Sequence, residues 1–135
     1  MFKRLSIPTR HKTEFIDVTA HIAQAVQESG VREGLCTVFV PHTTAGVCIQ
    51  ENADPNVPHD LINALHRLVP DDIPYLHVEE GEENAPSHVR AMLVGSSQSL
   101  IVEGGQLRLG RWQAVFFCEF DGPRSREIWL HINGQ

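Results

Sequence analysis

The longest uninterrupted apolar run in the chain is only five residues, from Ala114 to Cys118. A transmembrane helix needs about 20 consecutive apolar residues, and the first residues alternate in polarity where a signal peptide would carry an apolar core. We therefore expect a soluble, unprocessed protein.

The size of the chain predicts one domain over residues 1–135. With 135 residues, of which 41% are hydrophobic, the chain can bury one core without disulfides or a structural metal. We find no internal repeat, low-complexity tract or inter-domain linker.

The N-terminal segment predicts a hairpin followed by a helix. Residues 2–7 alternate in polarity, residues 8–12 interrupt the pattern, and Phe15 and Ile16 resume it, which is typical of two paired strands. Helical spacing then begins, with Asp17 or Thr19 able to cap the start and Gly30 placed to end the helix. The apolar residues of this helix are Val18, Ile22, Ala25 and Val26.

Two strands and a second helix follow. Residues 35–40 and 45–50 are rich in strand-forming side chains, so the triplet from His42 to Thr44 falls at a bend between them. Asn56 can cap the helix, whose early Pro58 costs no internal hydrogen bond and which Pro70 terminates. Its predicted apolar face consists of Leu61, Ala64, Leu65 and Leu68.

A long polar loop and a short helix precede the last part of the chain. Residues 70–86 predict a loop of a length that is usually functional in compact domains. Residues 86–94 predict a helix behind an Asn84 cap, with Ser87 and His88 in its first turn and Gly95 at its end. Its predicted apolar face consists of Val89, Met92 and Leu93.

The C-terminal third predicts strands only. They cover residues 99–102, 106–109, 112–120 and 127–132, and glycine turns separate the first three. Strands with helices inserted mid-chain, without strict alternation, indicate the α+β class and argue against a doubly wound α/β fold.

Charge and cysteine content narrow the functional classes. The net charge of −6 leaves no basic stripe for a nucleic acid. Three cysteines, Cys36, Cys48 and Cys118, without a CxxC pair, predict neither a disulfide framework nor a cysteine zinc site. We expect a reducing, cytoplasmic setting, in which Cys118 is a packing residue and Trp112 belongs to the core or an interface.

Histidines are the first functional signal. The chain has eight, and His42, His77 and His88 could supply three nitrogen ligands to a metal such as zinc. Their separations of 35 and 11 residues match no short zinc motif. The alternative is that His42 ends a strand, His77 lies in a solvated loop and His88 is an ordinary first-turn residue.

Carboxylates are the second signal. Glu51, Asp54 and Asp60 could provide a general base or a magnesium ligand, but Asp54 can equally form an Asx turn and Asp60 can stabilise a helix N-terminus. Glu119 stands in an otherwise apolar strand, so its ionised form requires a partner or a perturbed pKa.

Candidate phosphate donors form the third signal. They are the helix start near Ser87, the turn of Gly95, Ser96 and Ser97, and Arg124 after a glycine-proline pair. The polar blocks that begin at Pro41 and Glu51 add Thr43, Thr44 and Asn52 as candidate phosphate-binding residues.

Four strings in this order resemble the YjbQ family, also called the secondary thiamine-phosphate synthase family. They are HTTAGVCIQENADPNV from His42, a Tyr75-x-His77 pair, EGEENAPSHVRAMLVGSS from Glu80, and LGRWQAVFFCEFDGPRSRE from Leu109. Together they cover nearly the whole chain. Asp121 to Arg124 depart from the family pattern, in which a histidine- and glycine-rich stretch precedes paired arginines; both Arg124 and Arg126 are therefore candidates for phosphate contact.

The resemblance implies a fold, an assembly and an activity. The fold would be α+β, with about seven to eight strands in two packed mixed or antiparallel sheets and two to three helices, in a homotrimer. The activity would be a weak thiamine-phosphate synthase reaction, which joins hydroxymethylpyrimidine diphosphate to a thiazole phosphate. The pocket would hold a divalent metal, zinc or magnesium, at His42, His77 and His88.

A mechanism and two alternatives follow from these expectations. The metal and basic groups would stabilise the departing diphosphate, His42 would be catalytic, and Asp54 or Glu119 would balance the cationic pyrimidine methylene. The alternatives are a non-enzymatic trimer that binds a metal or a small phosphorylated metabolite, and a metal-dependent hydrolase.

Overall fold

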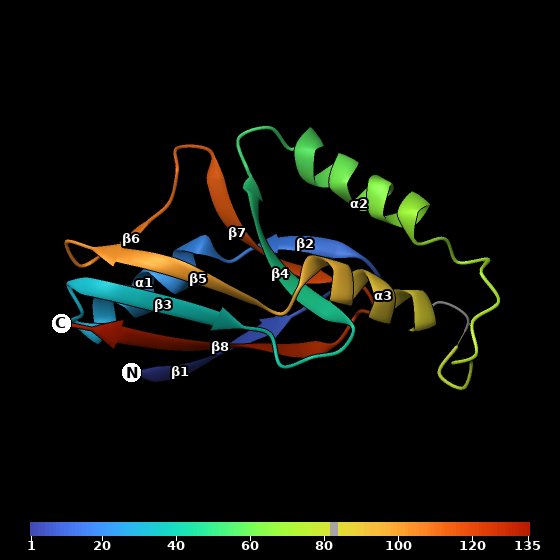
Figure 1. Ribbon diagram of the computed structural model, residues 1–135, viewed down its shortest axis with the longest axis horizontal. Coiled ribbons are helices and arrows are strands. Elements are labelled where there is room, and N and C mark those ends of the chain that lie inside the picture. The colour runs from blue at the N-terminus through green and yellow to red at the C-terminus, as the bar shows by residue number, and fades with distance from the viewer. Residues whose placement is uncertain (82–83) are drawn as a thin grey trace.

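Two antiparallel sheets and three helices make up the described part of the computed structural model, which comprises residues 1–81 and 84–135 (Figure 1). The larger sheet has the strand order β1-β8-β3-β5-β6 and the smaller β2-β7-β4. The strands are β1 (Phe2–Pro8), β2 (Glu14–Asp17), β3 (Glu33–Phe39), β4 (Ala45–Glu51), β5 (Ser97–Glu103), β6 (Gln106–Arg108), β7 (Gln113–Glu119) and β8 (Ser125–Gly134). The helices are α1 (Thr19–Ser29), α2 (Asn56–Leu68) and α3 (Asn84–Val94). The predicted α+β class is confirmed.

The main core lies where the two sheets and α1 meet. Strand β8 alternates, with Ile128, Leu130 and Ile132 turned inward, and Val115 and Phe117 of β7 belong to the same cluster. Helix α1 adds its buried face, and it ends at Gly30 in the left-handed conformation, as predicted. The Asp17 carboxylate accepts the backbone N–H of Thr19 at 2.9 Å, so Asp17 satisfies an amide at the start of the helix.

The predicted N-terminal hairpin is wrong. Strand β1 pairs with β8, from Phe2 opposite His131 to Pro8 opposite Ser125, whereas β2 pairs with β7 in the other sheet. Residues 9–13 therefore cross from one sheet to the other. Alternation shows that a segment is a strand, but it carries no information about a partner more than 100 residues away.

The two later helices form, but α2 begins at Asn56 with Pro55, not Asn56, in the cap position, and the buried faces of both helices differ from the predictions. No residue of α2 is buried, and Leu68 is 73% exposed. In α3 the predicted face is wrong, since Met92 and Leu93 are exposed. The helix instead buries Ala85, Ser87, Arg90 and Ala91, among other residues. Asn84 is the first residue of this helix rather than a residue before it.

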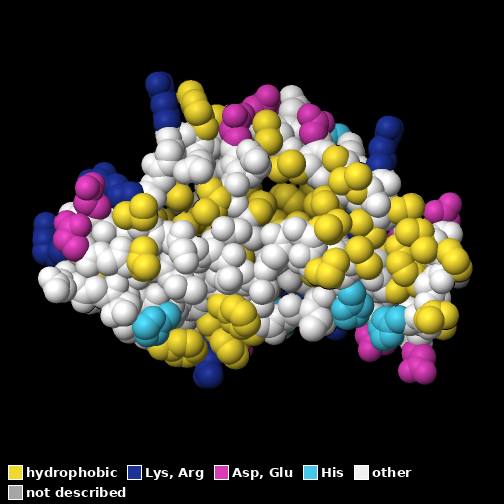
Figure 2. Space-filling view, viewed as in Figure 1, with side chains coloured by type: hydrophobic (Ala, Val, Ile, Leu, Met, Phe, Trp, Pro, Cys, Tyr) yellow, Lys and Arg dark blue, Asp and Glu magenta, His cyan; other side chains and the backbone are white. Residues whose placement is uncertain are grey.

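A second, smaller core lies on the other face of the three-stranded sheet. It contains Phe116, Cys118 and Phe120, and Leu65 of α2 packs against it. Figure 2 shows that hydrophobic side chains gather on the side of the molecule that carries α2 and α3. No helix in the described ranges is long and apolar enough to cross a membrane.

A close approach of two backbones brings the end of α3 onto β4. A Cβ atom at Gly46 would lie 2.6 Å from the carbonyl oxygen of Gly95, which only glycine avoids. The backbone N–H of Val47 donates to that same oxygen at 3.0 Å. This contact places Ser96 beside the bend that carries the His-Thr-Thr triplet.

Candidate functional site

A pocket of about 590 Å³ opens where the bend between β3 and β4 meets the starts of α3, β5 and β8. Its lining is mainly polar. The residues are Phe39, Val40, Pro41, His42, Thr43, Thr44, His77, Glu80, Asn84, His88, Ser96, Arg124 and Arg126. The three predicted histidines therefore line one cavity although they are distant in sequence.

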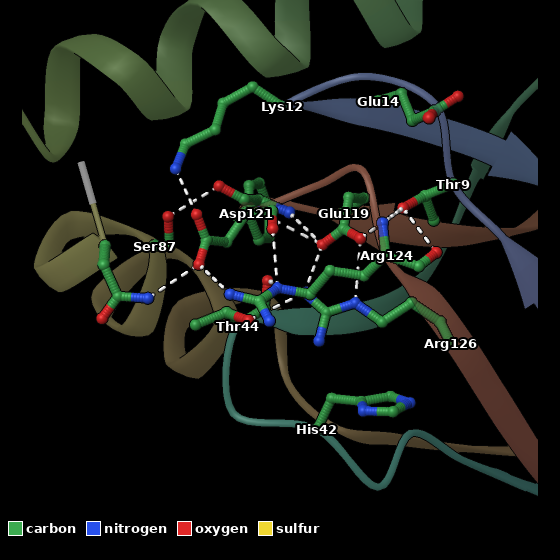
Figure 3. Close-up of polar contacts among 12 residues, drawn as sticks. Thr9, Lys12, Glu14, His42, Thr44, Ser87, Glu119, Asp121, Arg124 and Arg126 are labelled. Carbon is green, nitrogen blue, oxygen red and sulfur yellow. Dashed lines mark hydrogen bonds and ion pairs between the residues drawn. The ribbon is translucent and has the colours of Figure 1, made fainter. Parts of the chain in front are cut away.

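A buried ion pair forms the floor of this site. Glu119 at the end of β7 has no exposed surface, and Arg126 in β8 is 5% exposed. The Arg126 Nε donates to Glu119 Oε1 at 2.8 Å and its Nη2 donates to Oε2 at 2.5 Å (Figure 3). The pair spans the two sheets, because β7 and β8 belong to different ones.

Glu119 receives hydrogen bonds on both of its oxygens. Oε1 also accepts the Thr9 hydroxyl at 2.6 Å, and Oε2 accepts the backbone N–H groups of Phe120 and Asp121 at 3.0 and 3.1 Å. Burial acts to raise the pKa of the Glu119 carboxyl. The hydrogen bonds from Arg126, Thr9 and the Asp121 amide have the larger, opposite effect, so the net result is a lowered pKa. The prediction that an ionised Glu119 requires a partner is confirmed.

Arg126 also binds the His-Thr-Thr triplet. Its Nη2 donates to the Thr44 hydroxyl at 2.7 Å, and the Thr44 carbonyl accepts the N–H of Phe120 at 3.1 Å. His42, two residues earlier, accepts the backbone N–H of Glu127 on its Nε2 at 2.9 Å. An accepting Nε2 requires the neutral ring with its proton on Nδ1. Burial and the nearby Arg126 charge lower the pKa of His42, which favours this neutral form.

Asp121 is the second anionic centre. It pairs with Arg124 at 2.8 Å and with Lys12, and it accepts the Asn84 amide at 2.7 Å. Burial acts to raise the pKa of Asp121, but the bonds from Lys12, Arg124 and Asn84 lower it to about 2. Asp121 is thus ionised at any physiological pH and orients the Asn84 side chain.

Asn84 brings two of the histidines together. Because its Nδ2 donates to Asp121, its Oδ1 faces His77 Nε2 at 2.8 Å and His88 Nε2 at 3.1 Å. The two rings lie edge to face with centroids 5.2 Å apart. An amide oxygen only accepts, so both imidazoles carry a proton on Nε2 in this arrangement.

The histidines only partly fit a metal site. The Nε2 atoms of His77 and His88 converge, but on the Asn84 oxygen to which they donate, and the Nε2 of His42 is occupied by the Glu127 amide. Within residues 1–81 and 84–135, no group of three or more His, Cys, Asp or Glu side chains is arranged to hold a metal ion. The metal remains a prediction.

Several predicted site residues lie elsewhere. The Asp54 carboxylate accepts the N–H of Asn56 at 2.9 Å, which is the Asx turn weighed against catalysis, and Asn52 donates to Asp17. Neither lines the pocket. The Ser87 hydroxyl is buried and donates to the Phe120 carbonyl at 2.6 Å. Also outside the lining are Glu51, Asp60 and Ser97, and the fully enclosed Glu119.

Other predicted residues do line the pocket, and the structure adds further ones. Thr43, Thr44, Ser96 and Arg124 lie there as expected. Glu80 and Asn84 were not predicted as site residues, and Thr9 was not predicted to bind Glu119. Glu80 stands in a run of acidic residues and Asn84 looks like an ordinary helix cap, so neither carried a distinguishing signal. Glu82 and Glu83 of the same string lie outside the described residues.

Comparison with known proteins supports the resemblance over the full length. A family model described as UPF0047 protein YjbQ-like matches residues 3–135. The UPF0047 protein of Methanocaldococcus jannaschii is 45% identical over 134 residues, which cover 99% of this chain and 95% of that protein. YugU of Bacillus subtilis is 41% identical, with 99% of this chain and all of YugU covered.

The chain belongs to the YjbQ/UPF0047 family.

Solved structures in this family share the fold. A Clostridium acetobutylicum protein superposes with a TM-score of 0.92 at 46% identity, covering 97% of this chain and 99% of its own. A Sulfolobus solfataricus protein gives a TM-score of 0.93 at 29% identity over 100% of this chain and 97% of that one, and it is described as being of unknown function. Membership of the family therefore establishes the architecture of this chain, whereas its chemistry must be inferred from the site.

Removing the Glu119 carboxylate should strongly destabilise the fold. Glu119→Ala leaves Arg126 buried and uncompensated, which costs about 3–5 kcal/mol of unfolding free energy. Urea unfolding at pH 7 measures the change. The control is Glu103→Ala, which removes an exposed pair with Arg108 and should cost less than about 1 kcal/mol. Equal, small losses in both variants would contradict a structural role for the buried pair.

Proposed function

We propose that the pocket binds a small phosphorylated metabolite through Arg124 and Arg126. Arg124 uses Nε and Nη2 on Asp121, and Arg126 uses Nε and Nη2 on Glu119 and Thr44. The Nη1 group of each arginine makes no hydrogen bond to the described part of the chain, and both residues line the pocket. This pair of uncommitted donors carries the proposal, since guanidinium groups bind phosphate oxygens well.

Hydroxyl and imidazole groups complete an anion site. Thr43 and Ser96 line the same cavity as the arginines, and His77 and His88 close its other side. Each arginine is already paired with a carboxylate, so the pocket has little excess positive charge of its own. A protonated histidine or a bound divalent cation, zinc or magnesium, would supply the missing charge.

We further propose that the reaction is thiamine-phosphate synthesis, as the family resemblance implies. The thiazole nitrogen would attack the pyrimidine methylene of hydroxymethylpyrimidine diphosphate while the carbon–oxygen bond breaks and its electron pair leaves with diphosphate. Arg124 and Arg126 would hold the departing diphosphate and stabilise its charge. His77 and His88 would hold a divalent metal through Nε2 only after these nitrogens gave up their protons and their bonds to Asn84, and the metal would then supply Lewis acidity.

The carboxylate roles in this mechanism differ from those expected from the sequence. Glu119 is enclosed by five donors, and Asp54 lies in the turn before α2, so neither reaches a ligand in the pocket. Glu80 lines the pocket and could balance the cationic methylene. His42, neutral and with Nδ1 protonated, would act as a hydrogen-bond donor to the substrate.

Substrate assays with matched variants test this function. Purified protein should convert the two substrates to thiamine phosphate, and should bind inorganic diphosphate in calorimetry. Arg124→Gln should weaken diphosphate binding roughly 10- to 100-fold, because it removes one charge-assisted hydrogen bond. His88→Ala should lower both turnover and the zinc content of the purified protein. Arg111→Gln and His59→Ala, which lie outside the pocket, should change nothing.

The outcomes separate the alternatives. Tight diphosphate binding without turnover would replace the synthase by a non-enzymatic binding protein. Chelator-sensitive release of phosphate from simple phosphoesters would favour the hydrolase. Failure to bind diphosphate at all would contradict the proposed phosphate site.

We also propose that the chain assembles as a homotrimer in the cytoplasm. Its support is the outer face of the five-stranded sheet, where Phe2, Leu35, Phe39 and Ile101 are 41–61% exposed, and where Phe39 packs against Trp129 with ring centroids 5.9 Å apart and ring planes tilted by 36°. Monomeric proteins seldom leave such a patch to water. The three cysteines are free, which agrees with a reducing setting.

Sedimentation equilibrium tests the assembly. The expected mass is three times the chain mass of 15.1 kDa. Leu35→Glu should lower it, because the substitution puts a charge into the apolar patch, whereas Gln27→Glu on the exposed side of α1 should leave it unchanged. A wild-type mass of one chain would rule out the trimer.

A further inference from the structure

Two cysteines from different parts of the sequence meet beneath α2. The Sγ atoms of Cys48 in β4 and Cys118 in β7 lie 3.6 Å apart. The strand register places Gly46 opposite Cys118 and Cys48 opposite Phe116, so the thiols are diagonal neighbours on adjacent strands. Both belong to the smaller core cluster rather than to the polar pocket.

The two thiols differ in access. Cys118 has no exposed surface, whereas Cys48 is partly exposed and lines an apolar cavity of about 170 Å³. The other walls include Leu61 and Leu65 of α2 and Val94 of α3. Helix α2 lies over Cys48, but none of its own residues is buried, so it shields Cys48 from solvent only weakly. A molecule as small as a peroxide can reach Cys48 first.

We propose that Cys48 and Cys118 form a peroxide-sensitive dithiol that closes to an intrachain disulfide. In the first step the Cys48 thiolate attacks one peroxide oxygen, the O–O bond breaks, and Cys48 becomes a sulfenic acid as hydroxide leaves. In the second step the Cys118 sulfur attacks the Cys48 sulfur, and the S–O bond breaks. The thiol proton leaves with that oxygen as water. Two thiols and one hydrogen peroxide thus give one disulfide and two waters.

The electrostatics of the pair assign the two roles. The hydrogen bond from the Cys118 thiol lowers the pKa of Cys48, which favours the attacking thiolate. Burial raises the pKa of Cys118, so this thiol is poorly reactive until an oxidised sulfur stands next to it. The third cysteine, Cys36, is buried in the main core, and burial raises its pKa to about 11.

Closure requires the side chains and the strands to move. The sulfurs must approach from 3.6 Å to about 2.05 Å, and because diagonal neighbours lie about 7–8 Å apart, β4 and β7 must also shift locally, next to the cavity beside Cys48. The new bond would join β4 to β7 four residues after Thr44, the last residue of the His-Thr-Thr triplet. Dithiol pairs of this kind in reducing compartments are typically reversible sensors. The inference does not rest on the proposed phosphate chemistry.

Mass spectrometry of the full chain tests the proposal. After brief exposure to hydrogen peroxide, the intact mass should fall by two hydrogen atoms, and peptide mapping should find Cys48 joined to Cys118. Dithiothreitol should restore the original mass. Cys36→Ser should behave like wild type, whereas Cys48→Ser should lose the crosslink and leave Cys118 as a thiol.

Each other outcome overturns the proposal. Sulfinic acid at Cys48 without a crosslink would show that Cys118 does not resolve it. A crosslink between two chains, or one that includes Cys36, would assign the chemistry to another pair. No oxidation under conditions that oxidise a model dithiol would remove the site. Cys118→Ala, which removes the resolving thiol, should stop at sulfenic or sulfinic acid on Cys48 and keeps the proposal testable should Cys48→Ser fail to fold.

Discussion

The buried pair of Glu119 and Arg126 is the constraint on which the rest of the site depends. Removing two charges from water is costly, and the cost is offset here by further hydrogen bonds to both Glu119 oxygens and from Arg126 to Thr44, not by the ion pair alone. Glu119 is the last residue of β7 in the smaller sheet and Arg126 lies near the start of β8 in the larger one, so their contact helps to fix how the two sheets meet. Thr9 on the crossing segment binds the same carboxylate.

Hydrogen bonds connect this pair and its neighbours in sequence to both walls of the pocket. On one side, Arg126 binds Thr44, and the adjoining Glu127 amide orients His42. On the other side, Asp121 follows Glu119 by two residues and holds Asn84, which gathers His77 and His88. The histidines thus depend on two carboxylates that do not themselves line the pocket. Such support is the usual way in which a protein preorganises a polar site.

Local elements could be predicted from the sequence because their signals are local. Helical spacing and Gly30 gave α1, and strand-forming residues on either side of the His-Thr-Thr triplet gave β3 and β4. Long-range pairing could not be predicted, because β1 finds its partner in β8 at the opposite end of the chain. The apolar residues Met92 and Leu93 suggested the buried face of α3, yet the helix buries Ser87 and Arg90, whose polar groups bind distant backbone carbonyls.

The site could be predicted only in part, because residue types are visible in the sequence but the long-range contacts that build the cavity are not. His42, His77 and His88 were grouped by residue type, and folding brings them to one cavity. The lone carboxylate in an apolar strand correctly indicated a buried, partnered Glu119, but its catalytic role is not supported by its position, since five donors occupy its oxygens. From the sequence, Asp54 could be either a catalytic carboxylate or part of an Asx turn. The structure shows the Asx turn, which is a local contact. Only the folded structure shows that Glu80 and Asn84 belong to the pocket.

A double-mutant cycle tests most directly whether the buried pair organises the His-Thr-Thr bend. Glu119→Gln and Thr44→Val would be made singly and together, and unfolding free energies compared. The two side chains make no hydrogen bond to each other, but both bind Arg126. The expected coupling energy exceeds about 0.5 kcal/mol, as for residues in one network. Additive losses, within about 0.3 kcal/mol, would show that the carboxylate and the bend are independent and would contradict the account.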